Sequence, residues 1–276
     1  MSSSRTAILI LGMHRSGTSS VTGSLAIQGA APPRTLMKPA EDNPKGFWES
    51  EILSSFNDRM LQRAGSSWHD WRSFDGHEIG TDINAFKEEA IRLIESEFGE
   101  AEIIVLKDPR ICRMVPFWRE ILKSMGYRLV ALSPLRAPAE VAASLMTRND
   151  MTRSHALRLW LRHVMDAEHF SRDLPRLILP WTDFLSDWRG QMQRIQSQLG
   201  LSLPSSPEIE AEIDTFLSAD LKHQNSLEPV PDWVANTYNH LLALSQDESL
   251  IEHRTALDHL RNGFNATTPL FLDAPH

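Results

Sequence analysis

The feature that most constrains the fold is a glycine-rich loop that directly follows an apolar run near the N-terminus. The apolar residues 8–11 lead into residues 12–19, which read GMHRSGTS. The glycine spacing and Ser19 match the Walker A phosphate-binding pattern, but Thr18 stands where that pattern has a lysine. Because the backbone N–H groups of such a loop and of the helix after it bind anions, we expect a phosphate to bind here.

The replaced lysine changes which nucleotide suits the loop. Without an ammonium group that reaches the β- and γ-phosphates, the loop lacks the usual means of splitting a nucleoside triphosphate. A positive charge remains at Arg15, whose planar fork of donors fits an oxyanion. The loop therefore favours a shorter, differently charged nucleotide. The plainer alternative is a strand-to-helix turn that needs glycine only for its geometry.

Apolar runs alternate with helical patterns over much of the chain. Strand-like runs occupy residues 6–11, 102–106, 127–133 and 176–180, and the clearest amphipathic helices cover 85–98 and 156–170. This alternation is typical of parallel βαβ units covered by helices on both faces. We expect an α/β, P-loop NTPase-like three-layer fold with a central parallel sheet and additional C-terminal helices. Residues 1–276 are predicted to form one domain, with an α/β cofactor-binding core at 6–182 and a mainly helical extension at 183–276.

Composition limits the classes of partner. The chain has 276 residues, 41% of them hydrophobic, and 28 basic against 36 acidic residues, which gives a net charge of −8. This balance argues against nucleic-acid binding and against acidic membranes, so any basic site must be local. The eleven histidines show no ligand pair at metal-binding spacing beside carboxylates, and no metal is predicted.

Cysteine content and the N-terminal segment bear on the compartment. Cys112 is the single cysteine, which excludes a disulfide framework and is consistent with a reducing compartment. The N-terminal apolar run of about seven residues is too short for a signal core or a membrane span. We expect a cytoplasmic protein without integral membrane contact.

Two proline-rich regions interrupt the regular patterns. Residues 31–46 contain four prolines and cannot form a regular helix, so this stretch is expected to be a substrate-side lid. Residues 203–231 form the second proline-rich region, and a helical C-terminal part follows it.

A second anion site is predicted after the third strand. Arg136 ends that strand, and Pro138 fits the first turn of a helix that carries Ser144. Ligands bind at the carboxyl ends of the strands in open α/β sheets, so Arg136 is expected to face the same crevice as the glycine-rich loop. Two anion sites at one edge imply a doubly phosphorylated ligand.

These paired motifs resemble the sulfotransferases that use 3′-phosphoadenosine-5′-phosphosulfate (PAPS), especially the bacterial members. The resemblance runs from about residue 6 to residue 182. It also includes residues 42–50, DNPKGFWES, and residues 107–110, KDPR. It implies PAPS as the sulfuryl donor, and it implies that one loop and one helix hold the donor. The implied donor-binding residues are Arg15, Ser16, Gly17, Thr18 and Ser19 for the 5′-phosphosulfate, with Arg136 and Ser144 for the 3′-phosphate.

The resemblance also implies catalytic roles. Glu49 is the first candidate for the general base, and Lys107 is placed to stabilise the leaving phosphate. For Glu49 the alternative is a favourable acid in the first turn of a helix that begins near residue 49. His14 and the His69-Asp70 pair are competing candidates for the base.

Several other residues have open roles. Arg110 is predicted to bind substrate or to support the loop, and the plainer alternative is a salt bridge. His223-Gln224-Asn225 lies roughly where family members have a cofactor loop but lacks their basic-glycine pattern. Aromatic residues that suit either the core or a substrate wall are Trp48, Trp68, Trp71 and Trp118.

The function predicted from the sequence is transfer of a sulfuryl group from PAPS to a hydroxyl or amine. The acceptor is expected to be a small molecule, a lipid or a carbohydrate, and the sequence does not favour one oligomeric state. A small-molecule kinase with a degenerate Walker A motif is one alternative. A nucleotide-binding module without catalysis is the other.

Overall fold

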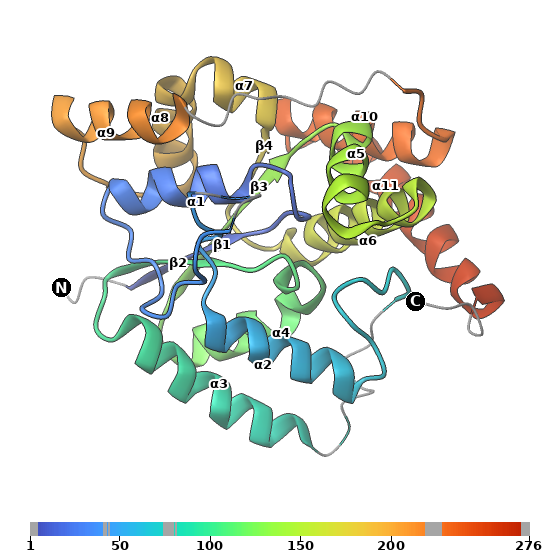
Figure 1. Cartoon of the computed structure of the whole chain (residues 1–276), viewed down its shortest axis with the longest axis horizontal. Helices are drawn as coiled ribbons and strands as arrows, with labels where there is room; N and C mark the ends of the chain where they lie inside the picture. The colour runs from blue at the N-terminus through green and yellow to red at the C-terminus, as the bar shows by residue number, and fades with distance from the viewer. Residues whose placement is uncertain are drawn as a thin grey trace.

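A parallel sheet forms the centre of the molecule (Figure 1). The computed structural model describes residues 5–40, 43, 45–73, 80, 82–218 and 228–271. Within these residues the sheet has four strands in the order β2-β1-β3-β4, and every neighbouring pair is parallel. The strands are β1 (Thr6–Ile10), β2 (Ile103–Lys107), β3 (Arg128–Leu135) and β4 (Arg176–Pro180). Their nearly continuous apolar sequences fit strands that are covered on both faces.

Helices cover the two faces of the sheet as separate layers (Figure 1). One layer contains α1 (Thr18–Ile27), α7 (Trp181–Ser186), α8 (Trp188–Leu199) and α9 (Pro207–Ser218). The opposite layer contains α2 (Glu51–Arg63), α3 (Ile83–Phe98) and α4 (Ile111–Ser124). Successive residues of β1 alternate between the two cores, with Ile8 in the first and Leu9 in the second. The expected α/β architecture with a central parallel sheet is confirmed.

The remaining helices form a third packed group beside β3 and β4 (Figure 1). This group consists of α5 (Pro138–Asn149), α6 (Arg153–Ser171), α10 (Asp232–Gln246) and α11 (Ile251–Thr267), and a short 3₁₀ helix follows at Thr268–Phe271. The helix α6 packs against both α4 and α5, and nearly every residue of its central turns is buried. None of the described helices combines the length and apolarity needed to cross a lipid bilayer.

The proline-rich stretch after α1 has no regular helix in its described part. It is fastened at two points, where Ala31 pairs with Ile104 and Leu36 pairs with Ser50 in isolated bridges. Its start therefore lies along the edge strand β2, and its later part pairs with the residue before α2, while the Phe47 carbonyl accepts a hydrogen bond from Ser19 of α1. The division of the chain at residue 182 stays a prediction, as does the role of the stretch as a lid.

Candidate active site

The glycine-rich loop has the geometry of an anion cradle. Gly17 has φ +85°, lies in the left-handed region and caps α1 without a side-chain hydrogen bond. A Cβ atom at this position would lie only 2.3 Å from the ring of Trp181, so both the backbone angle and the close packing require glycine. The first N–H groups of α1 have no partner within the helix and are available to an anion.

Ser16 adds a polar atom to this cradle. Its side chain is buried, and its Oγ makes no hydrogen bond with the described residues. An unpaired hydroxyl costs free energy when it is buried, so an oxyanion that accepts from it would remove that cost. The residues of the loop therefore fit a bound phosphate or sulfate group.

Thr18, which stands in the lysine position of the motif, packs into the interior. Its side chain is buried, and a Cβ atom added to Gly12 would come within 2.8 Å of its methyl group. Its carbonyl accepts a hydrogen bond from the hydroxyl of Thr22 one turn later. Thr18 thus closes the base of the loop by packing.

The cation beside the loop comes from a neighbouring strand instead. Lys107 is the last residue of β2, next to β1 in the sheet, and its side chain is almost fully buried. Its ammonium group donates to the Phe47 carbonyl at 2.9 Å and to the hydroxyl of Ser19 at 3.4 Å. It also forms an ion pair with Glu49. The structure therefore brings Lys107, Glu49 and Ser19 together.

Glu49 lies just before α2 and outside its first turn. The helix begins at Glu51, and its N-cap is Ser50, whose hydroxyl accepts a hydrogen bond from the Leu53 N–H at 3.1 Å. The carbonyl of Glu49 accepts from Met37 N–H at 2.8 Å, which fixes this segment beside the proline-rich stretch. An interaction with the helix dipole is therefore not the main role of this carboxylate, because Lys107 binds it directly.

The carboxylate of Glu49 is held in a buried, charged environment. Burial raises the pKa of Glu49 above the ordinary glutamate value, while the positive charge of Lys107 acts in the opposite direction. Arg110 adds a more distant positive charge, with 3.9 Å between its Nη1 and Oε2 of Glu49. A carboxylate with a raised pKa beside an ammonium group is suited to take up a proton.

Arg110 lies near the Glu49 carboxylate and is held by two aspartates. Its guanidinium donates to Asp58 at 2.6 Å and to Asp108 at 3.0 Å. Burial alone would lower the pKa of Arg110, but the charges of Asp108 and Asp58 raise it. Asp108 also accepts from Asn57 at 2.9 Å, and Asn57 in turn accepts from the indole N–H of Trp118 at 3.1 Å. These bonds are those of a salt bridge that joins the end of β2 to α2, and a role of Arg110 in binding substrate or supporting the loop stays a prediction.

Trp48 has an unusual backbone for a large residue. Its φ is +59°, in the left-handed region that a tryptophan rarely adopts. The indole lies edge-on to Phe216 of α9, with 5.8 Å between ring centroids, and approaches the backbone of α1 at Gly23. The packing of this ring holds the strained backbone, which directs the Phe47 carbonyl and the Glu49 carboxylate toward Lys107.

The residues of the predicted second anion site contact Arg15 of the glycine-rich loop, on the side away from Lys107. Arg15 donates from Nε to the Ser144 hydroxyl at 2.8 Å, and Arg136 donates to the Arg15 carbonyl at 3.1 Å. Arg136 also forms an ion pair with Glu140 one turn along α5, at 2.7 Å. The three residues predicted to hold two phosphates therefore lie together.

The other candidate bases lie around Trp68. The imidazole of His14 packs edge-on against this indole, with 5.1 Å between ring centroids, and the ring of His69 packs edge-on against the same indole at 5.3 Å. Burial, with the charges of Arg110 and Lys107, lowers the pKa of His14 well below its ordinary value, so the ring is neutral. Its Nε2 atom is covered and makes no hydrogen bond with the described residues.

The bonds of Asp70 do not lead to its neighbour His69. Its carboxylate accepts from the backbone and side chain of Arg72 at 2.9 Å and from Ser66 at 3.0 Å. Burial alone would raise the pKa of Asp70, but the hydrogen bonds from Arg72 lower it to about 2. These contacts make Asp70 a structural anion and leave His69 without the carboxylate partner that the sequence suggested.

The fold around this site has a counterpart of known structure. No protein-family model matches the sequence, and no curated protein matches it. Among solved structures, the sulfotransferase domain of the Synechococcus PCC 7002 olefin synthase superposes with a TM-score of 0.50, over 87% of this chain and 94% of that domain, at 16% identity. The chain has the sulfotransferase fold. A sulfotransferase from Mycobacterium tuberculosis H37Rv superposes with a TM-score of 0.46 at 16% identity, over 76% of this chain and 71% of that one.

Some residues of this sulfotransferase fold surround the site but were not predicted from the sequence. Glu140 is one of them, although its position four residues after Arg136 on a helix is a signal for an ion pair. Asn57, Asp58 and the Phe47 carbonyl gave no such signal, because their contacts join segments that are distant in sequence. His223-Gln224-Asn225, Asp42 and Pro44 lie outside the described residues.

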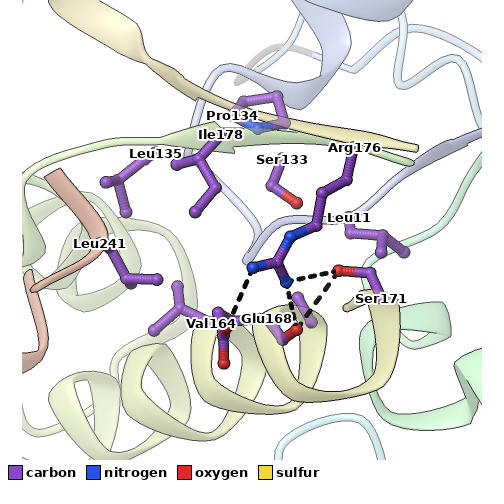
Figure 2. A pocket seen from close by; sticks show the side chains of 11 residues that line it. Leu11, Ser133, Pro134, Leu135, Val164, Glu168, Ser171, Arg176, Ile178 and Leu241 are labelled. Atoms are coloured by element: carbon purple, nitrogen blue, oxygen red, sulfur yellow. Dashed lines mark hydrogen bonds and ion pairs between the residues drawn. The ribbon is translucent and has the colours of Figure 1, made fainter. Parts of the chain in front are cut away.

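A small cavity lies under the sheet, on the side of α6 (Figure 2). Figure 2 shows the Arg176 side chain reaching into it toward Glu168 and Ser171 of that helix. Arg176 donates to the Glu168 carboxylate at 3.1 Å and to the Glu168 carbonyl at 2.6 Å. The guanidinium and the carboxylate therefore form an ion pair within the cavity. The volume of about 20 Å³ suffices for one water molecule, which makes this cavity a packing feature of the fold.

Proposed function

We propose that this protein is a PAPS-dependent sulfotransferase. It transfers the sulfuryl group to a hydroxyl or amine of a small-molecule, lipid or carbohydrate acceptor. The observation that carries the proposal is the placement of cations on both sides of one anion-binding loop. Lys107 contacts Ser19 on one side, while Arg136 and Ser144 contact Arg15 on the other. Such a pair of sites fits a nucleotide with phosphates on two positions of its ribose.

The donor would be held by groups that are already directed toward the loop. The N–H groups at the start of α1 and the Ser16 hydroxyl suit the 5′-phosphosulfate, and Ser19 supplies a further hydroxyl. Arg136 and Ser144 suit the 3′-phosphate, with Arg15 between the two ends. The proposed reaction needs no metal ion.

PAPS supplies the activated sulfuryl group, and the protein supplies charge and a proton acceptor. Lys107 donates a hydrogen bond toward the bridging oxygen, where negative charge develops as the sulfur–oxygen bond breaks. Glu49 accepts the proton of the acceptor hydroxyl or amine as the new bond to sulfur forms. The proton ends on Glu49, and the electron pair of the broken bond ends on the leaving phosphate.

The direct ion pair between Glu49 and Lys107 links the two roles. Before reaction, the ammonium neutralises the carboxylate and keeps it ready to accept a proton. Once Glu49 is protonated, its hold on Lys107 weakens, and the ammonium can shift its hydrogen bond to the leaving oxygen. His14 is the second candidate base, because its ring is neutral and its Nε2 makes no bond with the described residues.

The nucleotide preference tests this proposal. Isothermal titration calorimetry with adenosine 3′,5′-bisphosphate, the product of PAPS, should show binding that does not depend on magnesium and is tighter than that of ATP. Incubation with PAPS and a panel of hydroxyl and amine acceptors should then give sulfated products by mass spectrometry. Preferred binding of ATP with magnesium-dependent hydrolysis would favour the kinase instead. Binding of the bisphosphate without any sulfated product would favour a module without catalysis.

A further inference from the structure

Phe216, near the end of α9, packs against the segment that carries the proposed base. Its ring lies edge-on to the indole of Trp48, with 5.8 Å between ring centroids. The Nζ atom of Lys45 lies over the same ring, 4.9 Å from its centroid, in a cation–π contact. Both ends of the segment 45–48 therefore contact one aromatic ring, and Glu49 follows directly.

The ring reaches this segment across α1, at a place where that helix has no side chain. The helix α9 packs beside α1 (Figure 1). A Cβ atom at Gly23 of α1 would lie 2.2 Å from Cζ of Phe216 and 3.0 Å from Cε2 of Trp48. Glycine is unfavourable in the interior of a helix, and at this position it opens the space that the two rings share.

The other side of the segment is bound to the glycine-rich loop and to β2. The Phe47 carbonyl accepts from Ser19 at 3.2 Å and from Lys107 at 2.9 Å, and Glu49 forms its ion pair with Lys107. Trp48 lies between Phe47 and Glu49 and has a φ of +59°, which is unfavourable for a residue with a Cβ atom. Hydrogen bonds thus fix the residues on either side of Trp48, and ring packing fixes Trp48 itself.

General packing of α9 does not account for this contact. Ile213 and Leu217 are buried in the apolar core on the α1 side of the sheet, whereas Phe216 is only partly buried. Two buried side chains therefore already anchor the helix. The contact of Phe216 with Trp48 is additional to them.

We propose that Phe216 is a positioning residue, which holds Trp48 in its left-handed conformation and thereby keeps the Glu49 carboxylate against Lys107. The inference rests on the proposed function, because it takes Glu49 as the base and Lys107 as the donor to the leaving oxygen. Phe216 acts through Trp48 and takes no part in the chemistry. Without its ring, Trp48 can return to a negative φ, which turns the Glu49 carboxylate away from Lys107.

Turnover at saturating PAPS measures the effect of the ring, with para-nitrophenol as the acceptor probe and mass spectrometry of the sulfated product. Phe216→Ala should lower kcat by roughly 10- to 100-fold, because a small displacement of a reacting group costs this much in rate. Phe216→Leu, which keeps an apolar side chain, should lie between this variant and the wild type. Calorimetry should show unchanged affinity for adenosine 3′,5′-bisphosphate in both variants, which also shows that they are folded.

Ile209→Ala is the matched control. Ile209 is another partly buried side chain of α9, about two turns before Phe216, and it packs against the same core. This variant should have the kcat of the wild type.

Substitutions at Trp48 test the backbone conformation directly. Trp48→Ala loses the ring but keeps a Cβ atom, so its φ should turn negative and kcat should fall as in Phe216→Ala. Trp48→Gly loses the same ring but tolerates a positive φ, and it should retain a higher kcat than Trp48→Ala. In the Trp48→Gly background, Phe216→Ala should have no further effect on kcat, because the ring that it supports is gone.

A second readout does not depend on the acceptor. Carbon NMR of protein with labelled glutamate follows the titration of the Glu49 carboxyl group, whose signal is assigned with Glu49→Gln. Burial raises the pKa of Glu49, with Lys107, Asp108 and Arg110 as the neighbouring charges. Phe216→Ala should move the titration midpoint down toward the ordinary glutamate value, because the carboxylate leaves its buried place, and Ile209→Ala should leave the midpoint unchanged.

Four outcomes would overturn the inference. They are a wild-type kcat and Glu49 midpoint in Phe216→Ala, an equal loss of kcat in Ile209→Ala, equal kcat in Trp48→Gly and Trp48→Ala, and weaker bisphosphate binding by Phe216→Ala with kcat unchanged. The last outcome would make the ring a nucleotide contact. If the wild type does not sulfate para-nitrophenol, the Glu49 midpoint decides. Failure of the wild type to bind the bisphosphate would instead refute the proposed function, and the midpoint would still report whether Phe216 holds Glu49.

Discussion

The two sides of the glycine-rich loop carry similar charges in very different surroundings. On the β2 side, Lys107 and Glu49 have side chains that are only 3% and 4% exposed, and hydrogen bonds surround them. On the β3 side, the paired side chains of Arg136 and Glu140 are 13% and 20% exposed and make fewer contacts. The first pair is enclosed in protein, and the second faces partly into water.

This difference separates two tasks. Charges act more strongly on one another where water is excluded, so the buried side can stabilise a charge that develops during reaction. The more exposed side is screened by solvent, and its ion pair can exchange one anion for another at low cost. We therefore expect changes on the β2 side to affect turnover and changes on the β3 side to affect binding.

The largest effect is expected from Lys107→Ala. Turnover should fall by roughly 10³-fold, because a charged donor to the leaving oxygen is lost. The free energy of unfolding should also fall by about 3–5 kcal/mol, since Glu49 is left as a buried charge without its main partner. Steady-state kinetics and urea denaturation measure the two effects. The double variant with Glu49→Gln should recover much of the stability but none of the activity, and stability that does not recover would contradict the proposed pairing.

Glu49→Gln should have the next largest effect. Turnover is expected to fall by about 10²-fold or more, because the amide cannot accept the proton, while affinity for adenosine 3′,5′-bisphosphate stays nearly intact. Single-turnover kinetics and calorimetry separate the two quantities. Unchanged turnover would move the base to His14 or His69.

The pH dependence provides an independent check on the base. Because the base must be deprotonated, kcat/KM of the wild type should fall about tenfold per pH unit below the raised pKa of Glu49, and Glu49→Gln should lack this limb. The raised pKa also means that the folded protein binds this proton more tightly than the unfolded chain. The contribution of Glu49 to stability is therefore present at low pH and is lost as pH rises through that pKa. A limb that disappears in His14→Asn instead would assign the proton to the histidine.

Arg136→Ala tests the more exposed side. Affinity for adenosine 3′,5′-bisphosphate should weaken by about 1–3 kcal/mol, the cost of a lost charged hydrogen bond, with turnover at saturating PAPS nearly unchanged. Adenosine 5′-phosphosulfate, which lacks the 3′-phosphate, is the matched control ligand and should bind the wild type and the variant equally. An unchanged dissociation constant for the bisphosphate would refute the assignment of Arg136 to the 3′-phosphate.

Ser144→Ala should give the smallest effect. It removes the hydrogen bond from Arg15, and about 0.5–1.5 kcal/mol of affinity for the bisphosphate should be lost. Calorimetry on Ser144→Ala, Arg136→Ala and the double variant measures their coupling. A loss larger than that of Arg136→Ala would reverse the order of the two residues at this site.

Sequence patterns predicted the sheet and several helices because those depend on short-range periodicity. All four strands occur within two residues of the expected positions, and α3 and α6 contain the two amphipathic helices. A helical pattern was expected after the second strand, but without bounds; the helix there, α4, contains Pro116, and its backbone departs from helical geometry at Met114. Packing of α4 against α6 stabilises the helix despite its proline. That packing joins distant segments, so the local sequence pattern does not show it.

The contacts within the site were harder to predict from the sequence than the sheet and helices. The motifs identified the loop, Lys107 and Arg136, but the bonds of Asp70 to Arg72 and the ion pair of Arg136 with Glu140 depend on the folded geometry. The left-handed backbone of Trp48 gave no sequence signal either, because that conformation normally points to glycine or asparagine. Long-range packing selects these features, and local patterns in a single sequence do not record it.

The strand order has a consequence for the length of the ligand. Lys107 ends β2 and Arg136 follows β3, so the two cations flank the central strand β1 and the loop that follows it. Neighbouring strands are spaced by about 4.8 Å, so the ends of β2 and β3 are offset by roughly 10 Å across the sheet. Backbone hydrogen bonds between the strands fix this offset, and side-chain substitutions do not change it. A substitution at either cation therefore changes the reach of its side chain but leaves the offset between the two strand ends unchanged.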